Sequence, residues 1–395
     1  MQICDYKHEC TGCGACSKVC PAHSINMVAN AEGFLESNID ELSCIKCGKC
    51  SKICPSGNSF KNNFALNELQ AFSFTGNDDD SLKESSSGGA FSALAQEVIK
   101  RGGVVFGAKF DENYNVIQTG IDKLENMNTI RGSKYVQSDT KDTYLEAKRY
   151  LADSRIVLYV GTPCQIAGLY AALGYKDYEN LFTVDILCHG VPSGALFKSY
   201  IAYLENKYGK ITSYLFRDKT KYGWGNWGSF KHTDSRSKNH IKYFVVANDY
   251  FYSLYFKECN FRECCYSCKY AALPRIGDIT LGDCWGIEEI NPRAYSKKGV
   301  SLILINNEKG RALFDHSIRN NQVTNLNAND VIKYNRTIVS PTKRPPSRDT
   351  FYDDYIKLGF EESAKRYCRL KHVVPIVARY IPRGIKRTLK KLLKG

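Results

Sequence analysis

Nine of the seventeen cysteines lie in the first sixty residues, in two runs of identical spacing and one separate position. The runs "CTGCGACSKVCP" (10–21) and "CIKCGKCSKICP" (44–55) both follow the pattern C-x2-C-x2-C-x3-C-P. This spacing is typical of bacterial domains that hold two 4Fe-4S clusters, in which the fourth cysteine of each run binds the other cluster. It predicts two crossed ligand sets: Cys10, Cys13, Cys16 and Cys54 for one cluster, and Cys44, Cys47, Cys50 and Cys20 for the other.

Zinc is the alternative metal, because C-x2-C pairs also occur in zinc sites. A four-coordinate zinc site uses two such pairs and has no use for a third and a fourth cysteine in each run. The repeated run with its following proline therefore favours iron–sulfur clusters. Residues 1–60 are predicted to form a two-cluster ferredoxin-type domain.

Two further cysteines each end an apolar run. Cys164 follows "RIVLYV" (155–160), and Cys188 closes "LFTVDILC" (181–188). A helix-like stretch separates them, so strand, helix and strand follow one another as in a parallel βαβ unit. Parallel strands end at the same edge of a sheet, where open α/β folds bind ligands. We therefore expect both thiols at one carboxyl edge.

A cysteine-rich stretch, "CNFRECCYSCKY" (259–270), offers partners for these two thiols. Its C-x2-C pair is Cys265 and Cys268, with Cys259 and Cys264 as alternatives. Two thiols from the sheet edge and one such pair would complete a third Cys4 site for a cluster. Zinc binding and ordinary buried thiols are the alternatives, and the thiol after the first strand could also be a nucleophile.

The rest of the pattern predicts a mixed α/β or α+β protein in four parts. These are the ferredoxin-type domain at 1–60, a polar linker at 61–84, a mixed α/β domain at 85–345 and a helical basic tail at 346–395. In the third part, the periodicity predicts helices at 90–101, 140–154 and 165–173, strands at 102–110, 277–283 and 299–306, and antiparallel strands within 211–248.

The formal charge of +14 is partly local, since residues 379–395 hold seven Lys and Arg and no acid. Each Cys-ligated cluster would subtract about two charges. No recognition motif accompanies the charge, so no nucleic-acid partner is expected. The tail suits either an amphipathic helix on an anionic membrane surface or a solvated basic segment. No secretory signal or membrane-spanning run is visible, which predicts a cytoplasmic protein, peripheral on the inner membrane face if the tail binds there.

Several stretches resemble, in the same order, the coenzyme F420 hydrogenase/dehydrogenase β-subunit family. They are "ESSSGGAFSALAQEVIKRGGVVFGA", "GSKYVQS", "GTPCQIAGL", "ILCHGVPS", "CYSCKY" and "GDITLGDCWG", within residues 84–290. The resemblance implies an FAD protein with an iron–sulfur cluster beside the flavin. The cysteines that match the family's cluster ligands are Cys164, Cys188, Cys265 and Cys268, with Cys264 as a substitute for Cys265. The other cysteines, which would be free thiols, are Cys4, Cys259, Cys264, Cys284 and Cys368.

The resemblance also places the flavin site in "SSGGAF" and "GSKY", which implies that it is lined by Ser87, Gly88, Gly89, Lys134 and Tyr135. From the residues alone, the first stretch is a helix start whose N–H groups could bind phosphate, and the lysine is an ordinary surface residue. His189 is a candidate catalytic proton donor, with a plain loop residue as the alternative. Asp278 and Asp283 match family positions and are otherwise turn residues.

Together these observations predict an iron–sulfur flavoprotein oxidoreductase. Electrons would pass between the two N-terminal clusters, a third cluster and FAD, because a flavin can join one-electron and two-electron steps. The resemblance extends to ferredoxin-fused proteins found beside polysaccharide-assembly genes, which suggests a sugar-linked or other small-molecule substrate in polysaccharide biosynthesis. The alternatives are a non-catalytic subunit that delivers electrons to a partner oxidoreductase, an F420-dependent oxidoreductase and a scaffold with structural clusters. A redox partner, either a ferredoxin or an oxidoreductase, is expected; the direction of electron flow and the oligomeric state stay open.

Overall fold

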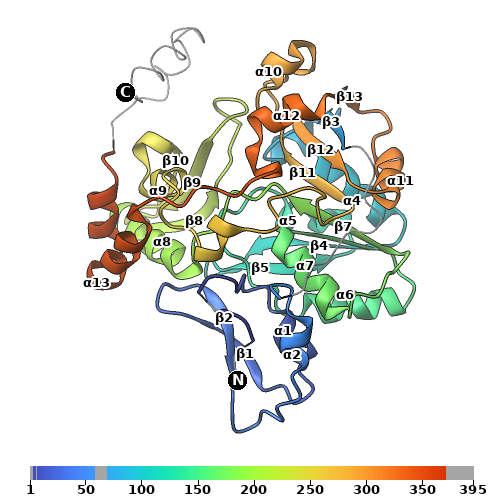
Figure 1. Ribbon diagram of the computed structural model, residues 1–395. Coiled ribbons are helices and arrows are strands. Elements are labelled where there is room, and N and C mark those ends of the chain that lie inside the picture. The colour runs from blue at the N-terminus through green and yellow to red at the C-terminus, as the bar shows by residue number, and fades with distance from the viewer. Residues whose placement is uncertain (1–2, 6, 58–68, 371–395) are drawn as a thin grey trace.

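An eight-stranded mixed sheet forms the centre of the computed structural model, which describes residues 3–5, 7–57 and 69–370 (Figure 1). In sheet order the strands are β13 (Gln322–Leu326), β3 (Gln70–Thr75), β12 (Ser301–Ile305), β11 (Ile279–Asp283), β7 (Leu181–Ile186), β6 (Val157–Gly161), β4 (Val104–Phe110) and β5 (Val116–Ile121). The central pairs β11–β7, β7–β6 and β6–β4 are parallel, and the outer pairs are antiparallel.

Helices cover both faces of this sheet. One face packs against α4 (Ala90–Lys100) and α11 (Glu308–Ser317), and the other against α6 (Thr143–Ala152) and α7 (Pro163–Ala172). The central strands are therefore buried on both sides, which explains why their sequences are continuous apolar runs. Shorter helices complete this part: α3 (Asp79–Glu84), α5 (Met127–Ile130), α10 (Ile287–Ile290) and α12 (Ala328–Tyr334).

The predicted parallel βαβ unit is present as β6–α7–β7. Helix α7 begins with a capping box, in which the Thr162 N–H donates to the Gln165 side-chain oxygen at 3.0 Å. Pro163 occupies the first helical position, where a missing N–H leaves no acceptor unsatisfied. Cys164 therefore lies in the first turn of α7, and Cys188 follows the end of β7, so both lie at the carboxyl edge of the sheet.

A second lobe contains the antiparallel sheet β10–β9–β8, as predicted for residues 211–248. Its elements are β8 (Lys210–Leu215), β9 (Trp227–Thr233), β10 (Asn239–Val245), α8 (Gly194–Tyr208), α9 (Tyr250–Phe256) and α13 (Ser347–Tyr367). Helix α13 falls within the predicted basic tail, but Phe351, Tyr352 and Phe360 are buried in the aromatic core of this lobe. Residues 379–395, for which a membrane-surface contact is one expectation, lie outside the described residues.

The stretch predicted as a polar linker, 61–84, also differs from the expectation in its described part. It contains α3 and strand β3, which pairs with β12 on one side and β13 on the other. The strand is short and lies beside a polar sequence, so its Ala71 and Phe74, both almost fully buried, produce little periodic signal.

The N-terminal domain consists of α1 (Ala15–Val19), β1 (Ile25–Ala29), β2 (Leu35–Ile39) and α2 (Lys49–Ile53). It lies against the α6–α7 side of the main sheet (blue in Figure 1), where Ala15 of α1 joins the core of that face. No helix in the described ranges combines the length and the apolar character needed to cross a membrane.

Candidate functional site

The two N-terminal cysteine runs surround two small cavities, and each cavity takes its cysteines from both runs. Helices α1 and α2 cause this exchange, because the fourth cysteine of each run follows directly after its helix and points to the other cavity. Each helix starts at a glycine in the left-handed region, Gly14 with φ 78° and Gly48 with φ 71°. We call the two groups the inner set (Cys10, Cys13, Cys16 and Cys54) and the outer set (Cys20, Cys44, Cys47 and Cys50).

The inner cavity contains a fifth cysteine, Cys4, which is expected from the sequence to be a free thiol. Its thiol hydrogen-bonds to Cys10 and Cys54, and this bond is the largest cause that lowers the pKa of each of those two thiols to about 6. A cysteine outside the repeated spacing carries no local signal, so sequence reasoning could not place it. All seventeen cysteines are described, and none of them forms a disulfide.

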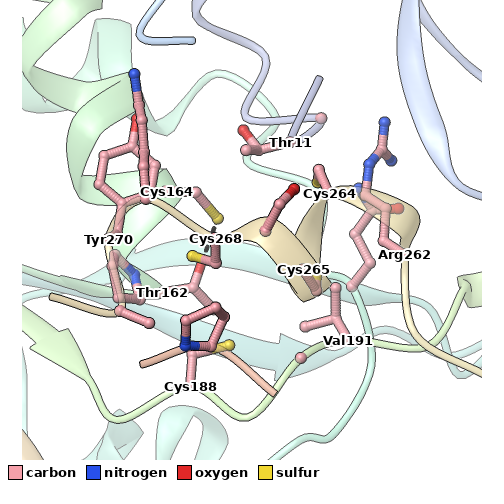
Figure 2. Close-up of a pocket in the computed structure, with 18 of the residues that line it drawn as sticks. Thr11, Thr162, Cys164, Cys188, Val191, Arg262, Cys264, Cys265, Cys268 and Tyr270 are labelled. Atoms are coloured by element: carbon pink, nitrogen blue, oxygen red, sulfur yellow. Dashed lines mark hydrogen bonds between the residues drawn. The ribbon is translucent and has the colours of Figure 1, made fainter. Parts of the chain in front are cut away.

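A third and larger cavity, of about 330 Å³, lies at the carboxyl edge of the main sheet (Figure 2). The sheet topology brings the loop after β6 and the loop after β7 together here, and the segment 259–270 closes the opposite side. Five cysteines line it: Cys164, Cys188, Cys264, Cys265 and Cys268. We call Cys164, Cys188, Cys265 and Cys268 the third set. In the described ranges, no three His, Cys, Asp or Glu side chains converge on a single metal-ion position; the thiols of all three sets instead surround cavities.

The electrostatics of the third cavity disfavour isolated thiolates. Burial, together with the neighbouring thiols, raises the pKa of Cys164 well above its ordinary value and that of Cys188 to about 12. A nucleophilic cysteine requires the opposite shift, toward a stable thiolate. A metal cluster would supply the positive charge that four thiolates in one buried space need. The residues therefore fit an iron–sulfur cluster better than a nucleophilic Cys164.

The third cavity and the inner set share a wall. Thr11 and Gly12, from the inner cysteine loop, also line the third cavity. On α7, one turn after Cys164, a Cβ placed on Gly168 would lie 3.1 Å from the Cys13 sulfur, so only a glycine allows the helix to approach so closely. The two cysteine sets are thus neighbours on opposite sides of a thin layer of protein.

Arg262 crosses this layer. Its Nε donates to the Cys10 carbonyl and its Nη1 to the Leu35 carbonyl, each at 2.7 Å. Burial disfavours its charge, but the thiols of Cys10, Cys264 and Cys265 raise the pKa of the guanidinium above its ordinary value. No sequence pattern singles out this arginine, because its contacts join segments more than two hundred residues apart.

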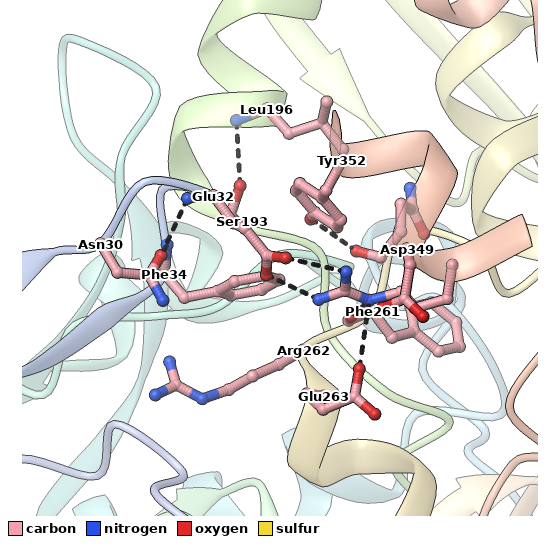
Figure 3. Close-up of polar contacts among 12 residues, drawn as sticks. Asn30, Glu32, Phe34, Ser193, Leu196, Phe261, Arg262, Glu263, Asp349 and Tyr352 are labelled. Carbon is pink, nitrogen blue, oxygen red and sulfur yellow. Dashed lines mark hydrogen bonds and ion pairs between the residues drawn. The ribbon is translucent and has the colours of Figure 1, made fainter. Parts of the chain in front are cut away.

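The same region is held by α13 (Figure 3). Arg348, with 1% of its side chain exposed, forms a two-pronged ion pair with Glu32 of the N-terminal domain at 2.7 and 2.9 Å. Its Nε also donates to the Phe261 carbonyl at 2.6 Å. Arg344 pairs with Glu263 at 2.6 Å. The segment before the Cys265–Cys268 pair is therefore fixed to both the N-terminal domain and the C-terminal helix.

His189, the candidate proton donor, lines the third cavity beside Cys188. Its Nε2 lies 2.9 Å from Glu258 Oε1, and Thr342 Oγ1 donates to its carbonyl oxygen at 2.6 Å. The imidazole is therefore oriented by a carboxylate while about a third of it stays exposed. This arrangement suits proton transfer at the cavity wall.

The two stretches expected to line the flavin site lie side by side, because the Ser133 N–H donates to Ser86 Oγ at 2.8 Å. Gly89 caps α4 in the left-handed region, and Ser87 Oγ donates to the Val300 carbonyl. Tyr135 stacks on a neighbouring tyrosine at 4.8 Å. None of the five residues predicted for the flavin lines the third cavity.

Two lysines near these stretches form no ion pair with a carboxylate of the described residues. Lys134 donates to the Arg131 and Gly132 carbonyls, and Lys219 to the Ser87 carbonyl at 2.5 Å. Burial lowers the pKa of Lys134 to about 7 and that of Lys219 to about 8. An anionic group such as a pyrophosphate would supply a matching negative charge, so the residues present fit a dinucleotide such as FAD.

The two aspartates of "GDITLGD" have different surroundings. Asp278 is buried and accepts from the Thr183 N–H at 2.7 Å, which favours a structural role. Asp283 pairs with Arg217 at 2.7 Å and accepts from the Trp224 indole at 2.8 Å. The same arginine donates to the Tyr135 hydroxyl at 3.2 Å, which links Asp283 to the predicted flavin stretch.

Comparison with known proteins locates two families in the chain. Residues 154–330 match the model that describes the C terminus of the coenzyme F420 hydrogenase/dehydrogenase β-subunit, and residues 9–58 match that of the 4Fe-4S dicluster domain. No curated protein matches the chain. A solved structure, the xenon-derivatized F420-reducing NiFe hydrogenase complex from Methanosarcina barkeri, has a chain that is 17% identical. The match covers 78% of this chain and 94% of that chain, with a TM-score of 0.45. The protein described here is therefore an iron–sulfur electron-transfer protein that is related to the coenzyme F420 hydrogenase/dehydrogenase β subunit over residues 154–330 and to 4Fe-4S dicluster domains over residues 9–58.

Proposed function

We propose that this chain is an iron–sulfur flavoprotein oxidoreductase with three 4Fe-4S clusters, one on each cysteine set, and FAD. Its substrate would be a small or sugar-linked molecule of polysaccharide biosynthesis. The observation that carries the proposal is the shared wall between the inner set and the third set, formed by Thr11 and Gly12. Clusters exchange single electrons, and a flavin can combine them into pairs. A cysteine cavity placed against a two-cluster domain is what such a relay requires.

The exposure of the cysteines supports an order for the relay. Cys47 of the outer set is exposed, so an external redox partner can approach this set. Cys13 of the inner set contacts α7, which begins at the third set. The order outer, inner, third therefore leads from the protein surface to the edge of the main sheet. The proposed partner is a ferredoxin or another oxidoreductase, in either direction of electron flow.

The size of the third cavity favours an enzyme over a pure relay. The inner and outer cavities measure about 20 Å³ each, whereas the third measures about 330 Å³. The additional volume of the third cavity falls in the range of small-molecule sites in proteins. The walls of this cavity include His189 and Thr342. We assign His189 as the proton donor, held in place by Glu258.

Anaerobic purification tests the proposal directly. We expect about twelve irons and twelve sulfides per chain, with bound FAD released on denaturation. Zinc without visible absorbance would contradict all three cluster assignments. Steady-state reduction of F420 and of candidate small-molecule acceptors then separates an F420-dependent enzyme, a different oxidoreductase and a non-catalytic subunit, the last of which turns over only with a partner protein.

Paired serine variants of Cys265 and Cys264 test the fourth ligand of the third set. Both side chains line the cavity, and their thiols contact each other. The C-x2-C spacing assigns the ligand role to Cys265, so Cys265→Ser should lose about four irons and Cys264→Ser should lose none. Iron analysis and the visible spectrum of both variants decide the assignment. The reverse pattern would transfer the role to Cys264.

The pKa of Lys134 predicts a pH dependence for FAD binding. Because burial lowers this pKa to about 7, the side chain is a cation below pH 7 and becomes neutral as the pH rises above it. An anionic ligand binds the cation, so the Kd for FAD should increase about tenfold per pH unit above pH 7 until the complex itself loses the proton. Fluorescence titration of flavin-free protein between pH 6 and 9 measures this.

Two variants complete the pH experiment. Lys134→Met should bind FAD more weakly at pH 6 and show a flat pH profile up to about pH 8, where Lys219 begins to lose its proton. Lys123→Met, at an exposed lysine, should behave like the wild type. If the Kd for FAD of Lys134→Met rose with pH above pH 7 as steeply as that of the wild type, a role for this lysine in the flavin site would be contradicted.

A further inference from the structure

We propose that Arg262 is a positioning residue that couples the inner and third clusters. Its positive charge raises the reduction potentials of both, and its hydrogen bonds hold their ligand loops at a fixed separation. The inference rests on the proposed function for the third cluster, but not for the inner one, which lies in the 4Fe-4S dicluster domain.

The main chain of Arg262 belongs to the third site. Its N–H donates to the Val191 carbonyl at 2.9 Å, and Val191 lies three residues after Cys188. Its own carbonyl accepts from the Cys265 N–H, also at 2.9 Å. The residue is thus tied to two of the ligand loops of the third set, and Figure 2 shows it on the Cys264 and Cys265 side of that cavity, with Val191 below it.

The side chain of Arg262 belongs to the inner site. Its two hydrogen bonds end on main-chain carbonyls, one of them on the ligand residue Cys10 itself. The guanidinium lies over the Phe34 ring at 5.5 Å. A Cβ on Gly12 would lie 2.3 Å from the Leu35 carbonyl, 2.4 Å from Gln137 Nε2 and 3.1 Å from Arg262 Nη1, so a glycine is needed here to leave room for these groups. One hydrogen bond therefore joins a ligand residue of the inner cluster to Arg262, whose main chain is itself hydrogen-bonded to the ligand loops of the third cluster.

Arg262 forms no ion pair with a carboxylate of the described residues. Two acidic side chains of the junction pair with other arginines, Glu32 with Arg348 and Glu263 with Arg344. A third, Glu36, accepts from the Asn30 side chain at 3.1 Å and adds a negative charge near Arg262 without forming an ion pair with it. Arg262 itself is 3% exposed, and a buried cation is unfavourable unless negative charge lies nearby. A 4Fe-4S cluster with four thiolates carries about two negative charges, and reduction adds one. A nearby cation stabilises the added electron, which raises the potential of each cluster.

Substitutions at Arg262 separate its charge from its packing. In Arg262→Gln, the charge is lost, and the equilibrium constant for reducing either cluster at a fixed potential should fall at least about tenfold, equivalent to about 59 mV for one electron. Arg262→Lys keeps the charge and should shift both clusters by less than half as much. The readouts are iron content and midpoint potentials from redox titrations followed by electron paramagnetic resonance, on full-length protein purified without oxygen.

The control is the double variant Glu32→Gln with Arg348→Met, which removes a neutral ion pair from the same junction. It should leave both potentials unchanged. An Arg262→Gln protein with full iron content and wild-type potentials, or a control that shifts them equally, would overturn the inference. If Arg262→Gln loses iron, the Arg262→Lys variant decides. This variant keeps the charge, so a tenfold or larger change in the equilibrium constant for cluster reduction would also overturn the inference. Eight irons in the wild type would contradict the third cluster instead, and the potential of the inner cluster would then decide the role of Arg262.

Discussion

Replacing Cys164 with serine should remove about four of the twelve irons expected per chain and leave about eight. Cys164 lines the third cavity with Cys188 and the Cys265–Cys268 pair, while the inner and outer sets occupy separate cavities. Loss of one thiolate should therefore empty only the third site. Iron and sulfide analysis of anaerobically purified protein measures the change, and the visible absorbance should fall by about a third.

Cys284→Ser is the matched control for this experiment. Cys284 is fully buried but belongs to a different core, on the β11–β12 side of the sheet. Its variant should keep all twelve irons. A Cys164→Ser protein that also kept twelve would contradict the ligand assignment and favour a nucleophile at the end of β6.

Features with a short sequence range could be predicted well. The crossed grouping of the N-terminal cysteines follows from spacing, because a single helical turn separates the third cysteine of each run from the fourth. The meeting of Cys164 and Cys188 follows from the parallel pairing of β6 and β7, which apolar runs and a capped helix make recognisable. In each case the local pattern determines the relevant geometry.

Features that depend on packing between distant segments could not be predicted. The Arg262 side chain reaches Cys10 across 252 positions, and no pattern near either residue indicates the contact. Strand β3 is hard to recognise in a polar stretch because its partners, β12 and β13, lie more than two hundred residues away. The flavin stretches are an intermediate case: the Ser133–Ser86 hydrogen bond brings them together, whereas their relation to the third cavity depends on the whole fold.

Loss of the Glu32 carboxylate should loosen the N-terminal domain from the rest of the chain. Glu32 lies in the turn between β1 and β2. Among the described residues, it is the only one that accepts hydrogen bonds from Nη1 and Nη2 of Arg348. Glu32→Ala leaves a buried cation without its main partner, which costs about 3 kcal/mol. The value is at the low end of the range for broken buried pairs because Glu263 stays 3.9 Å from Arg348. Amide hydrogen exchange in β1 and β2 should become about a hundredfold faster.

A double variant tests whether the faster exchange in Glu32→Ala comes from an unpaired buried charge or from lost packing. Glu32→Gln combined with Arg348→Met leaves neither charge buried alone, so most of the slow exchange should return. Wild-type exchange rates in Glu32→Ala would mean that the remaining contacts, such as the 2.8 Å bond from the Leu35 N–H to Gln137, hold the domain by themselves. If the pair does hold it, faster opening should also slow electron exchange between the inner and third sets, because their separation is fixed only while the junction is closed. The rate of electron exchange between the two sets would then depend directly on the stability of this junction.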